Sequence, residues 1–325
     1  MQPVKLNDLV EMFVSDVCAG KTNTTPKTYR GKLSHLIKYF GADADPSAFT
    51  EIEVKKFKHH LETRKTKYRG KIIVNGSLSP FTVRSSLVSI RHFFKWAASS
   101  RYIPNNPMEK IKIQKPPAPD PKAVSNETFE KLVKTAIVEG EIWAQPRNVA
   151  ILYVLRDTGG RVGGLVGADI DNLDLTRGRM EVIEKGGKRN TLFLSPPTIQ
   201  ILKSWLEIRK TLDPKDYLIF TGKKGTGLTA SGIYGMLRRL ATSANVTGRH
   251  NPHAFRHAFA RDTLKAGADL SHVSQLMHHT SIVVTADYYA RWADNELRDM
   301  HSRFSPGRTM SPINFSEWET PEYCP

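Results

Sequence analysis

Residues 251 to 262, NPHAFRHAFARD, gather side chains that suit phosphate chemistry. His253 and Arg256 are three residues apart, so on a helix they share one face. A guanidinium offers forked N–H donors and stays charged at any working pH, which suits the nonbridging oxygens of a phosphate. A histidine beside it can exchange a proton near neutral pH. We therefore expect this pair to face a phosphate. His257 and Arg261 lie off that face and are expected to be structural or to contact a nucleic-acid backbone.

Other residues of the second half of the chain could complete such a site. They are Arg161 after the motif DTGG, Lys185 at the tip of an expected hairpin, His279, and Tyr288 nine residues later. A tyrosine hydroxyl can attack a phosphodiester and store its bond energy in a covalent phosphotyrosine. A lysine can protonate the departing oxygen. Each residue alone is a weak signal, and the prediction depends on the set and its order.

A metal site is the alternative interpretation of the histidines. His253 and His257 have the i,i+4 spacing of helix-borne zinc ligands, but no carboxylate lies between them and Arg256 would repel a cation. The sequence also lacks a convincing set of three acidic ligands of the two-metal nuclease kind. We therefore expect neither a metal nor another cofactor.

The elements that must position these residues form a mixed C-terminal part. Ser125 is expected to cap one helix, and residues 145–159 form an apolar pattern typical of a buried second helix. Residues 178–195 alternate as a hairpin through Met180, Val182 and Glu184, with a Lys-Gly-Gly-Lys turn. Further helices are expected at about 196–211, 229–244, 253–267 and 270–278.

The N-terminal part has the pattern of a small helical domain. Helices are expected from Thr25 to Gly41, from Thr50 with Glu53 as a capping box, and from Ser79 onward. Between the last two, a basic segment ends in Asn75-Gly76, which predicts a hairpin or loop with an Asn-Gly turn.

Four prolines lie within six positions of the segment 112–124, which is typical of an exposed linker. We therefore divide the chain into a helical domain (1–111), the linker, a mixed domain (125–305) and a tail (306–325). The predicted fold class is mainly α with a small β hairpin or sheet (α+β).

Charge points to a polyanionic partner. The 325-residue chain has a net charge of +16, and residues 1–122 hold 22 Lys and Arg against 10 Asp and Glu. Such a surface favours nucleic acid. No secretory signal or membrane span is apparent, and two cysteines near opposite ends do not make a disulfide framework. We expect a cytoplasmic protein, associated with the nucleoid if the host is prokaryotic.

The segments TGGRVGGLVGADIDNLDL, EVIEKGGKRNTLFL and PHAFRHAFARDTLKAGADLSHVSQLMHHTSIVVTADYY resemble the catalytic domain of the tyrosine recombinase, or phage integrase, family. YIPNNPMEKI is similar to the end of that family's core-binding domain. The resemblance covers roughly residues 5 to 303. The matched catalytic positions are Arg161, Lys185, His253, Arg256, His279 and Tyr288.

This resemblance implies a site-specific DNA recombinase of a mobile element, acting through a 3′-phosphotyrosine without metal or ATP. It implies two domains that close as a C-shaped clamp on double-stranded DNA, without an arm-binding domain. It also implies a dimer at each site and a tetramer in synapsis. A C-terminal segment, residues 294–304 or the aromatic tail, would be exchanged between protomers.

Two positions depart from the family pattern, and one assignment stays open. Gly164 stands where the family has an acidic residue, so the support of Arg161 is expected to be built differently or activity to be lower. His278 replaces a usual glycine. Tyr289 is an alternative nucleophile, although helical neighbours point about 100° apart. A type IB topoisomerase and a non-catalytic DNA-binding relative are the alternative functions.

Overall fold

The chain folds into two compact units, Met1–Pro117 and Ala118–Pro325. The computed structural model describes residues 4–20, 24–69, 72–117, 123–184 and 186–279, together with 286, 298, 301–303 and 305. Each unit is built around its own buried apolar core. The boundary between the units lies within the proline-rich segment 112–124.

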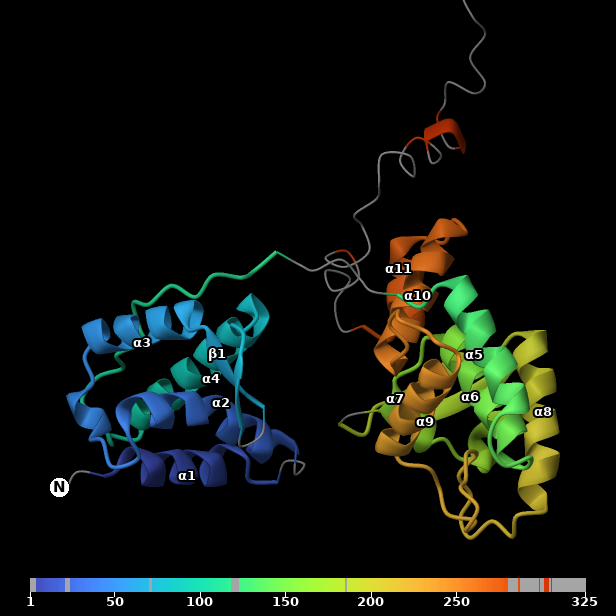
Figure 1. The fold of residues 1–325 in the computed structure, drawn as a ribbon, viewed down its shortest axis with the longest axis horizontal. Coiled ribbons are helices and arrows are strands. Elements are labelled where there is room, and N and C mark those ends of the chain that lie inside the picture. Colours follow the sequence, from blue (N-terminus) through green and yellow to red (C-terminus); the bar gives the residue numbers. More distant parts are fainter. Residues whose placement is uncertain are drawn as a thin grey trace, which may run out of the picture. The chain divides into compact units, whose positions relative to one another are not determined.

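The first unit is a helical bundle with one small hairpin (Figure 1). Its helices are α1 (Leu6–Val17), α2 (Thr24–Phe40), α3 (Glu51–Thr63) and α4 (Pro80–Ser99), with a 3-10 turn at Pro46–Ala48 and strands β1 (Thr66–Arg69) and β2 (Ile72–Asn75). Helix α4 packs against α1, α2 and α3. The aromatic ring of Phe13 makes edge contacts with Tyr29, His92, Phe93 and Trp96, which join α1, α2 and α4.

Local capping sets the helix starts in this unit. The Thr50 hydroxyl accepts from the Glu53 backbone while the Glu53 carboxylate accepts from the Thr50 backbone at 2.8 Å, so the predicted capping box is confirmed. Ser79 caps α4 as expected. The predicted Asn-Gly turn was wrong, because Asn75 lies in a strand and pairs with Thr66. Asn75 instead ends β2.

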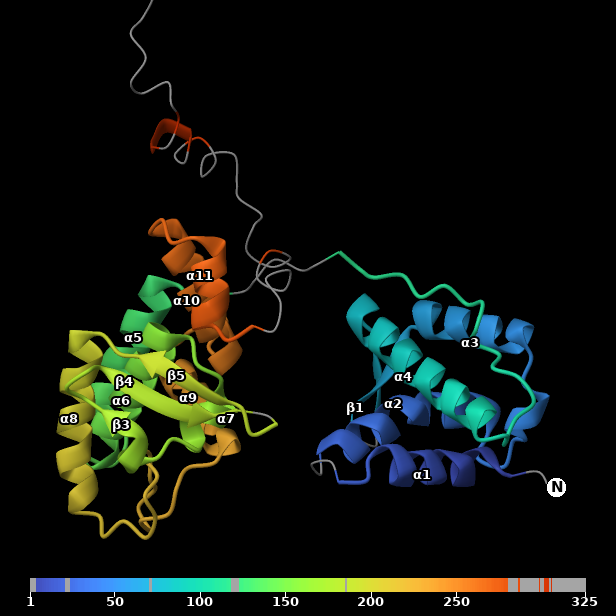
Figure 2. The ribbon, with the colours of Figure 1, turned by 180° about the vertical axis from the view of Figure 1, so that it is seen from behind.

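The second unit contains the elements expected to carry the catalytic residues. Its helices and strands are α5 (Asn126–Val138), α6 (Ala144–Thr158), α7 (Val162–Val166), a 3-10 turn (Ile170–Asn172), β3 (Leu173–Asp174), β4 (Arg179–Ile183), β5 (Arg189–Phe193), α8 (Pro196–Lys210), α9 (Ala230–Ser243), α10 (Pro252–Lys265) and α11 (Leu270–Leu276). The three strands form an antiparallel sheet in the order β3-β4-β5 (Figure 2).

Helix α6 is the central element of this unit. Its buried residues are distributed around the helix, and it packs against α5, α8 and α10, which confirms the predicted buried helix. On the hairpin Met180 and Val182 are buried, and Met180 pairs with Leu192, in agreement with the predicted alternation. Strand β3, only two residues long, was not predicted. The mainly helical architecture with a small antiparallel sheet is the predicted fold class.

The end of the proline-rich segment already belongs to the second unit. Val124 is fully buried in its core, and its N–H donates to the carbonyl of Ala254 on α10 at 3.1 Å. The chain therefore enters this unit against the helix that carries His253 and Arg256. In the described part of the chain, no helix is both long and apolar enough to cross a membrane.

Candidate active site

Arg161 lies where α6 ends and α7 begins. The chain leaves α6 at Thr158, passes through two glycines, and reaches Arg161 as the residue before α7. One terminal nitrogen of its guanidinium forms an ion pair with Glu184 Oε2, just beyond strand β4. The other donates to the carbonyl oxygen of His278 at 3.5 Å. The guanidinium therefore bridges the hairpin and the end of α11.

Glycine is required where α6 ends. Gly159 has a φ of 59°, in the left-handed region that side chains rarely adopt. A Cβ atom there would lie 2.6 Å from Cδ1 of Phe259 on α10, and one at Gly160 would lie 2.9 Å from Cδ1 of Leu192 on β5. The two glycines therefore let α10 and β5 approach the turn that presents the next residue, Arg161.

Arg256 is buried and held by backbone carbonyls. Asn251 starts α10 by accepting from the backbone of Ala254 at 3.0 Å, and Arg256 lies in the following turn with 6% of its surface exposed. Its Nη1 donates to the Gly159 carbonyl at 2.8 Å, and its Nη2 donates to the Met277 carbonyl. These bonds fix the plane of the guanidinium between the ends of α6 and α11.

His253 and His279 lie within the electrostatic reach of both arginines. Burial lowers the pKa of His253 below its usual 6.5, and the charges of Arg256 and Arg161 lower it further. The same causes, burial first, lower the pKa of His279 to about 4. Both rings are therefore mainly neutral at pH 7, and each keeps a nitrogen that can accept a proton or hydrogen bond. The structure thus brings four predicted residues together.

His257 lies beside this group. Burial lowers its pKa, and the charges of His253 and Arg256 add to the effect. Among the residues that the structure describes, no group of three or more His, Cys, Asp or Glu side chains could hold a metal ion.

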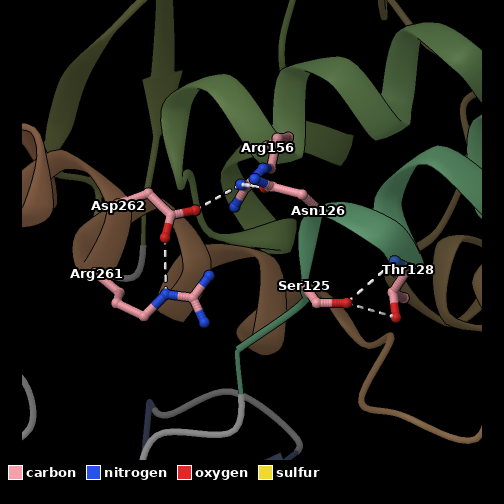
Figure 3. A network of polar contacts seen from close by, with 6 residues as sticks. All are labelled: Ser125, Asn126, Thr128, Arg156, Arg261 and Asp262. Atoms are coloured by element: carbon pink, nitrogen blue, oxygen red, sulfur yellow. Dashed lines mark hydrogen bonds and ion pairs between the residues drawn. The ribbon is translucent and has the colours of Figure 1, made fainter.

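A polar network anchors α10 to α5 and α6 (Figure 3). Asp262 accepts from Arg156 at 2.5 Å and from Nε of Arg261 at 2.7 Å, and Arg156 also donates to Asn126 at 2.6 Å. Burial raises the pKa of Asp262, but hydrogen bonds from Arg261 and Arg156 outweigh that effect and hold it below its usual value. Arg261 therefore takes part in the ion cluster that fixes the orientation of α10.

Two predicted catalytic residues, Lys185 and Tyr288, lie outside the described residues, as does Tyr289. The same holds for most of residues 294–304 and for the tail. The backbone on either side of Lys185 is closed by two hydrogen bonds, from Glu184 N to Lys188 O at 2.9 Å and from Gly187 N to Glu184 O at 3.0 Å.

Sequence reasoning missed the contact that Glu184 makes with Arg161, and took Glu184 only as a residue of the alternating hairpin. Its carboxylate pairs with Arg161, whereas Gly164 brings no carboxylate from α7. His278 was noted only as a departure from the family pattern. It adopts a φ of 52° and offers its carbonyl to Arg161. No local pattern marks either contact, because each joins residues far apart in the sequence.

Comparison with protein-family models gives two matches. Residues 124–296 match the model described as the phage integrase family, and residues 5–113 match the phage integrase SAM-like domain. Together these matches cover most of both units.

Curated proteins and solved structures agree with this result. A tyrosine recombinase XerD from Listeria monocytogenes serovar 1/2a is 27% identical over 311 residues, which cover 93% of this chain and 99% of the relative. The XerH site-specific recombinase bound to a palindromic difH substrate has a TM-score of 0.70 at 21% identity, over 92% of this chain and 84% of that one. The Tn1549 transposon integrase in complex with a circular intermediate DNA has a TM-score of 0.71 at 17% identity, over 93% and 99%.

Proposed function

Because this chain belongs to the phage integrase family, we propose that it is a site-specific DNA recombinase of the tyrosine type. It cleaves and rejoins DNA strands through a covalent 3′-phosphotyrosine intermediate. The observation that carries the proposal is the convergence of two oriented guanidinium groups with two neutral histidines in the second unit. Preorganised charge of this kind stabilises the negative charge that builds up on a transferring phosphate.

The proposed reaction uses six side chains. The hydroxyl oxygen of Tyr288 attacks the scissile phosphorus, the bond from phosphorus to the 5′-oxygen breaks, and that oxygen takes a proton from Lys185. Arg161 and Arg256 bind the nonbridging oxygens with their N–H groups. The phosphotyrosine conserves the energy of the bond, so a 5′-hydroxyl can reverse the step without ATP.

The two histidines have different proposed roles. His253 accepts the proton of the attacking tyrosine or binds the phosphate, and its lowered pKa supports the first role because a neutral ring can act as a base. His279 donates a hydrogen bond to a phosphate oxygen from its neutral ring.

The proposed partner is double-stranded DNA at a specific recombination site. Two copies bind each site and four form the synapse, with the two units of each copy clamping the duplex. The DNA complexes of the XerH recombinase and the Tn1549 integrase support a DNA substrate. The protein would act where that DNA lies, in the cytoplasm and at the nucleoid of a prokaryotic host.

Capture of the covalent intermediate tests this function. The probe is a set of nicked duplexes from the ends of the host element, in which the short cleaved piece diffuses away and prevents rejoining. We expect a protein–DNA adduct on a denaturing gel in the presence of EDTA and without ATP. Cleavage that chelation abolishes and a divalent metal restores would exclude this mechanism.

The same assay separates the two alternative functions. A DNA-binding relative without activity would bind every duplex of the set and form no adduct. A type IB topoisomerase would form adducts on many unrelated sequences, whereas the proposed recombinase would form them at one site.

A further inference from the structure

Glu184 is a buried acid in direct contact with a proposed catalytic arginine. Its side chain is only 9% exposed, and its Oε2 forms an ion pair with Arg161. Removing a carboxylate from water is costly unless a cation or several donors compensate. The ion pair with Arg161 therefore compensates the cost of burying this carboxylate at the end of strand β4.

Helix α7 passes close to the hairpin at Gly164. Gly164 is buried on α7, and a Cβ atom there would lie 3.2 Å from Cβ of Val182 and 3.7 Å from Cγ of Glu184. The helix therefore approaches the hairpin closely and contributes no side chain at this contact. The carboxylate that faces Arg161 comes from the hairpin instead.

His278 completes the surroundings of this carboxylate. Burial lowers the pKa of His278 below its usual value, and the nearby carboxylate of Glu184 opposes that effect without overcoming it. Within the described part of the chain, Glu184 Oε1 and His278 Nδ1 are both buried without a hydrogen-bond partner. The carbonyl of His278 accepts from Arg161. The carboxylate of Glu184 and the backbone carbonyl of His278 therefore both accept hydrogen bonds from Arg161.

Glu184 also belongs to the turn that carries Lys185. Its backbone N–H donates to Lys188 O at 2.9 Å, and its carbonyl accepts from Gly187 N at 3.0 Å. The backbone of Glu184 thus closes the turn while its side chain reaches Arg161. These two functions of the residue can be separated, because a substitution of the side chain leaves both backbone bonds possible.

From these contacts we infer that Glu184 is a positioning residue for the recombination reaction. Its carboxylate orients the Arg161 guanidinium toward the scissile phosphate. It replaces support that α7 cannot give at Gly164. This inference rests on the proposed function, because the orientation of Arg161 matters only if Arg161 binds the reacting phosphate.

The test compares Glu184→Ala with wild type by single-turnover cleavage of the nicked duplex at saturating protein. We expect adduct formation to slow by about tenfold to 100-fold, the order of loss that a small misplacement of a catalytic group produces. DNA affinity should change by less than about threefold, since Glu184 contributes no cation to counterion release. Glu181→Ala is the matched control, because Glu181 lies on strand β4 three residues before Glu184, is about half exposed and should leave cleavage unchanged.

Two further measurements show that Glu184 acts through Arg161. In an Arg161→Lys background, Glu184→Ala should cost several-fold less than in wild type, because an ammonium lacks the planar fork that the carboxylate orients. On a duplex whose leaving 5′-oxygen is replaced by sulfur, Glu184→Ala should stay slow, because its defect does not lie in proton donation. Equal losses in both backgrounds, or full recovery on the sulfur duplex, would overturn the inference.

Folding and function are controlled separately. Glu184→Gln keeps the shape of the side chain and should slow cleavage by an intermediate factor, so the test survives if the alanine variant unfolds. Wild-type cleavage by both variants would refute the role of Glu184 alone. Absence of any adduct with the wild-type protein would instead refute the proposed function.

Discussion

At the scale of single residues, the site stabilises neutral histidines beside fixed positive charges. Arg256 is buried and bound by two carbonyls, and Arg161 is paired with Glu184. The pKa values of His253 and His279 are lowered, because burial and two nearby cations oppose a further positive charge. A bound phosphate would reverse part of that opposition. The electrostatics of the site therefore favour binding of an anion.

The pH dependence of stability should reveal the lowered pKa of His279. The pKa of His279 is about 4 in the folded protein against 6.5 in the unfolded chain, so the unfolded chain binds more protons between those values. The contribution of His279 to the unfolding free energy should be fully present above pH 6.5 and decline as the pH falls toward 4. Urea titrations at several pH values should therefore show a weaker acid dependence in His279→Gln than in wild type. Identical curves would show that the ring is not held neutral.

The nucleophile is testable by removing one oxygen. Tyr288→Phe should bind target DNA as wild type does and form no covalent adduct, because only the attacking hydroxyl is lost. Tyr289→Phe is the matched control and should still form the adduct. The measurement is a denaturing gel after incubation with the nicked duplex. If the adduct persists in Tyr288→Phe and disappears in Tyr289→Phe, the nucleophile is the neighbouring residue.

The order of residues in the family pattern predicted part of this site and could not predict the rest. Arg161, His253, Arg256 and His279 follow from motif order, and the structure brings them together. The pair Arg161–Glu184 spans 23 positions and depends on how the hairpin lies against α7. Helical or strand periodicity carries no information about such a contact.

At the scale of elements, local signals placed the starts of α3 and α4 correctly. The Thr50 and Ser79 caps depend only on neighbouring residues, so the sequence suffices to find them. The Asn75-Gly76 pair misled the prediction of a turn, because the register pairs Asn75 with Thr66 at the end of β2 that lies away from the connection between the strands. Strand β3 forms two residue pairs with β4 and is too short for any alternation to mark it.

The turn after α6 should tolerate no side chain. Gly159→Ala would place a methyl group 2.6 Å from Phe259 at a φ of 59°. Left-handed strain and overpacking together predict a loss of about 2–4 kcal/mol in unfolding free energy. Cleavage should slow as well, because the displaced carbonyl of Gly159 orients Arg256. Gly163→Ala is the matched control, since nothing lies within 4 Å of its added Cβ. Equal stability of the two variants in denaturant titrations would contradict this account.

The hairpin turn should supply the acid that protonates the leaving 5′-oxygen. Lys185→Ala is expected to be severely slow on normal DNA and near wild type on DNA whose leaving oxygen is replaced by sulfur, which needs no protonation. Arg161→Ala should stay slow on both substrates, because its contact with the phosphate is not bypassed. If Lys185→Ala stays slow on the sulfur substrate, Lys185 only positions the DNA. Lys188 is then the next residue to test.

At the scale of the whole molecule, the sequence predicted two parts of different net charge. The first 122 residues hold most of the positive surplus, and exposed lysines such as Lys55, Lys56 and Lys95 lie on α3 and α4. The prolines of the segment 112–124 marked the region between the units. The sequence could not show that Val124 already packs in the second core, because that depends on its contact with α10.

This charge distribution predicts how salt should act on DNA binding. Each phosphate that the protein neutralises contributes a slope of about −0.9 to log affinity against log salt, so six contacts predict a loss of about 10³-fold between 50 and 200 mM salt. A fragment that starts at Val124 has its own core and lacks most of the surplus charge. It should bind more weakly than the full chain and show a shallower slope, because the phosphates bound by the first unit no longer contribute. Fluorescence anisotropy of a labelled duplex at several salt concentrations measures both quantities. A flat response of the full chain, or full affinity of the fragment, would mean that the first unit does not bind the DNA phosphates. The proposal that both units clamp the duplex would then be wrong.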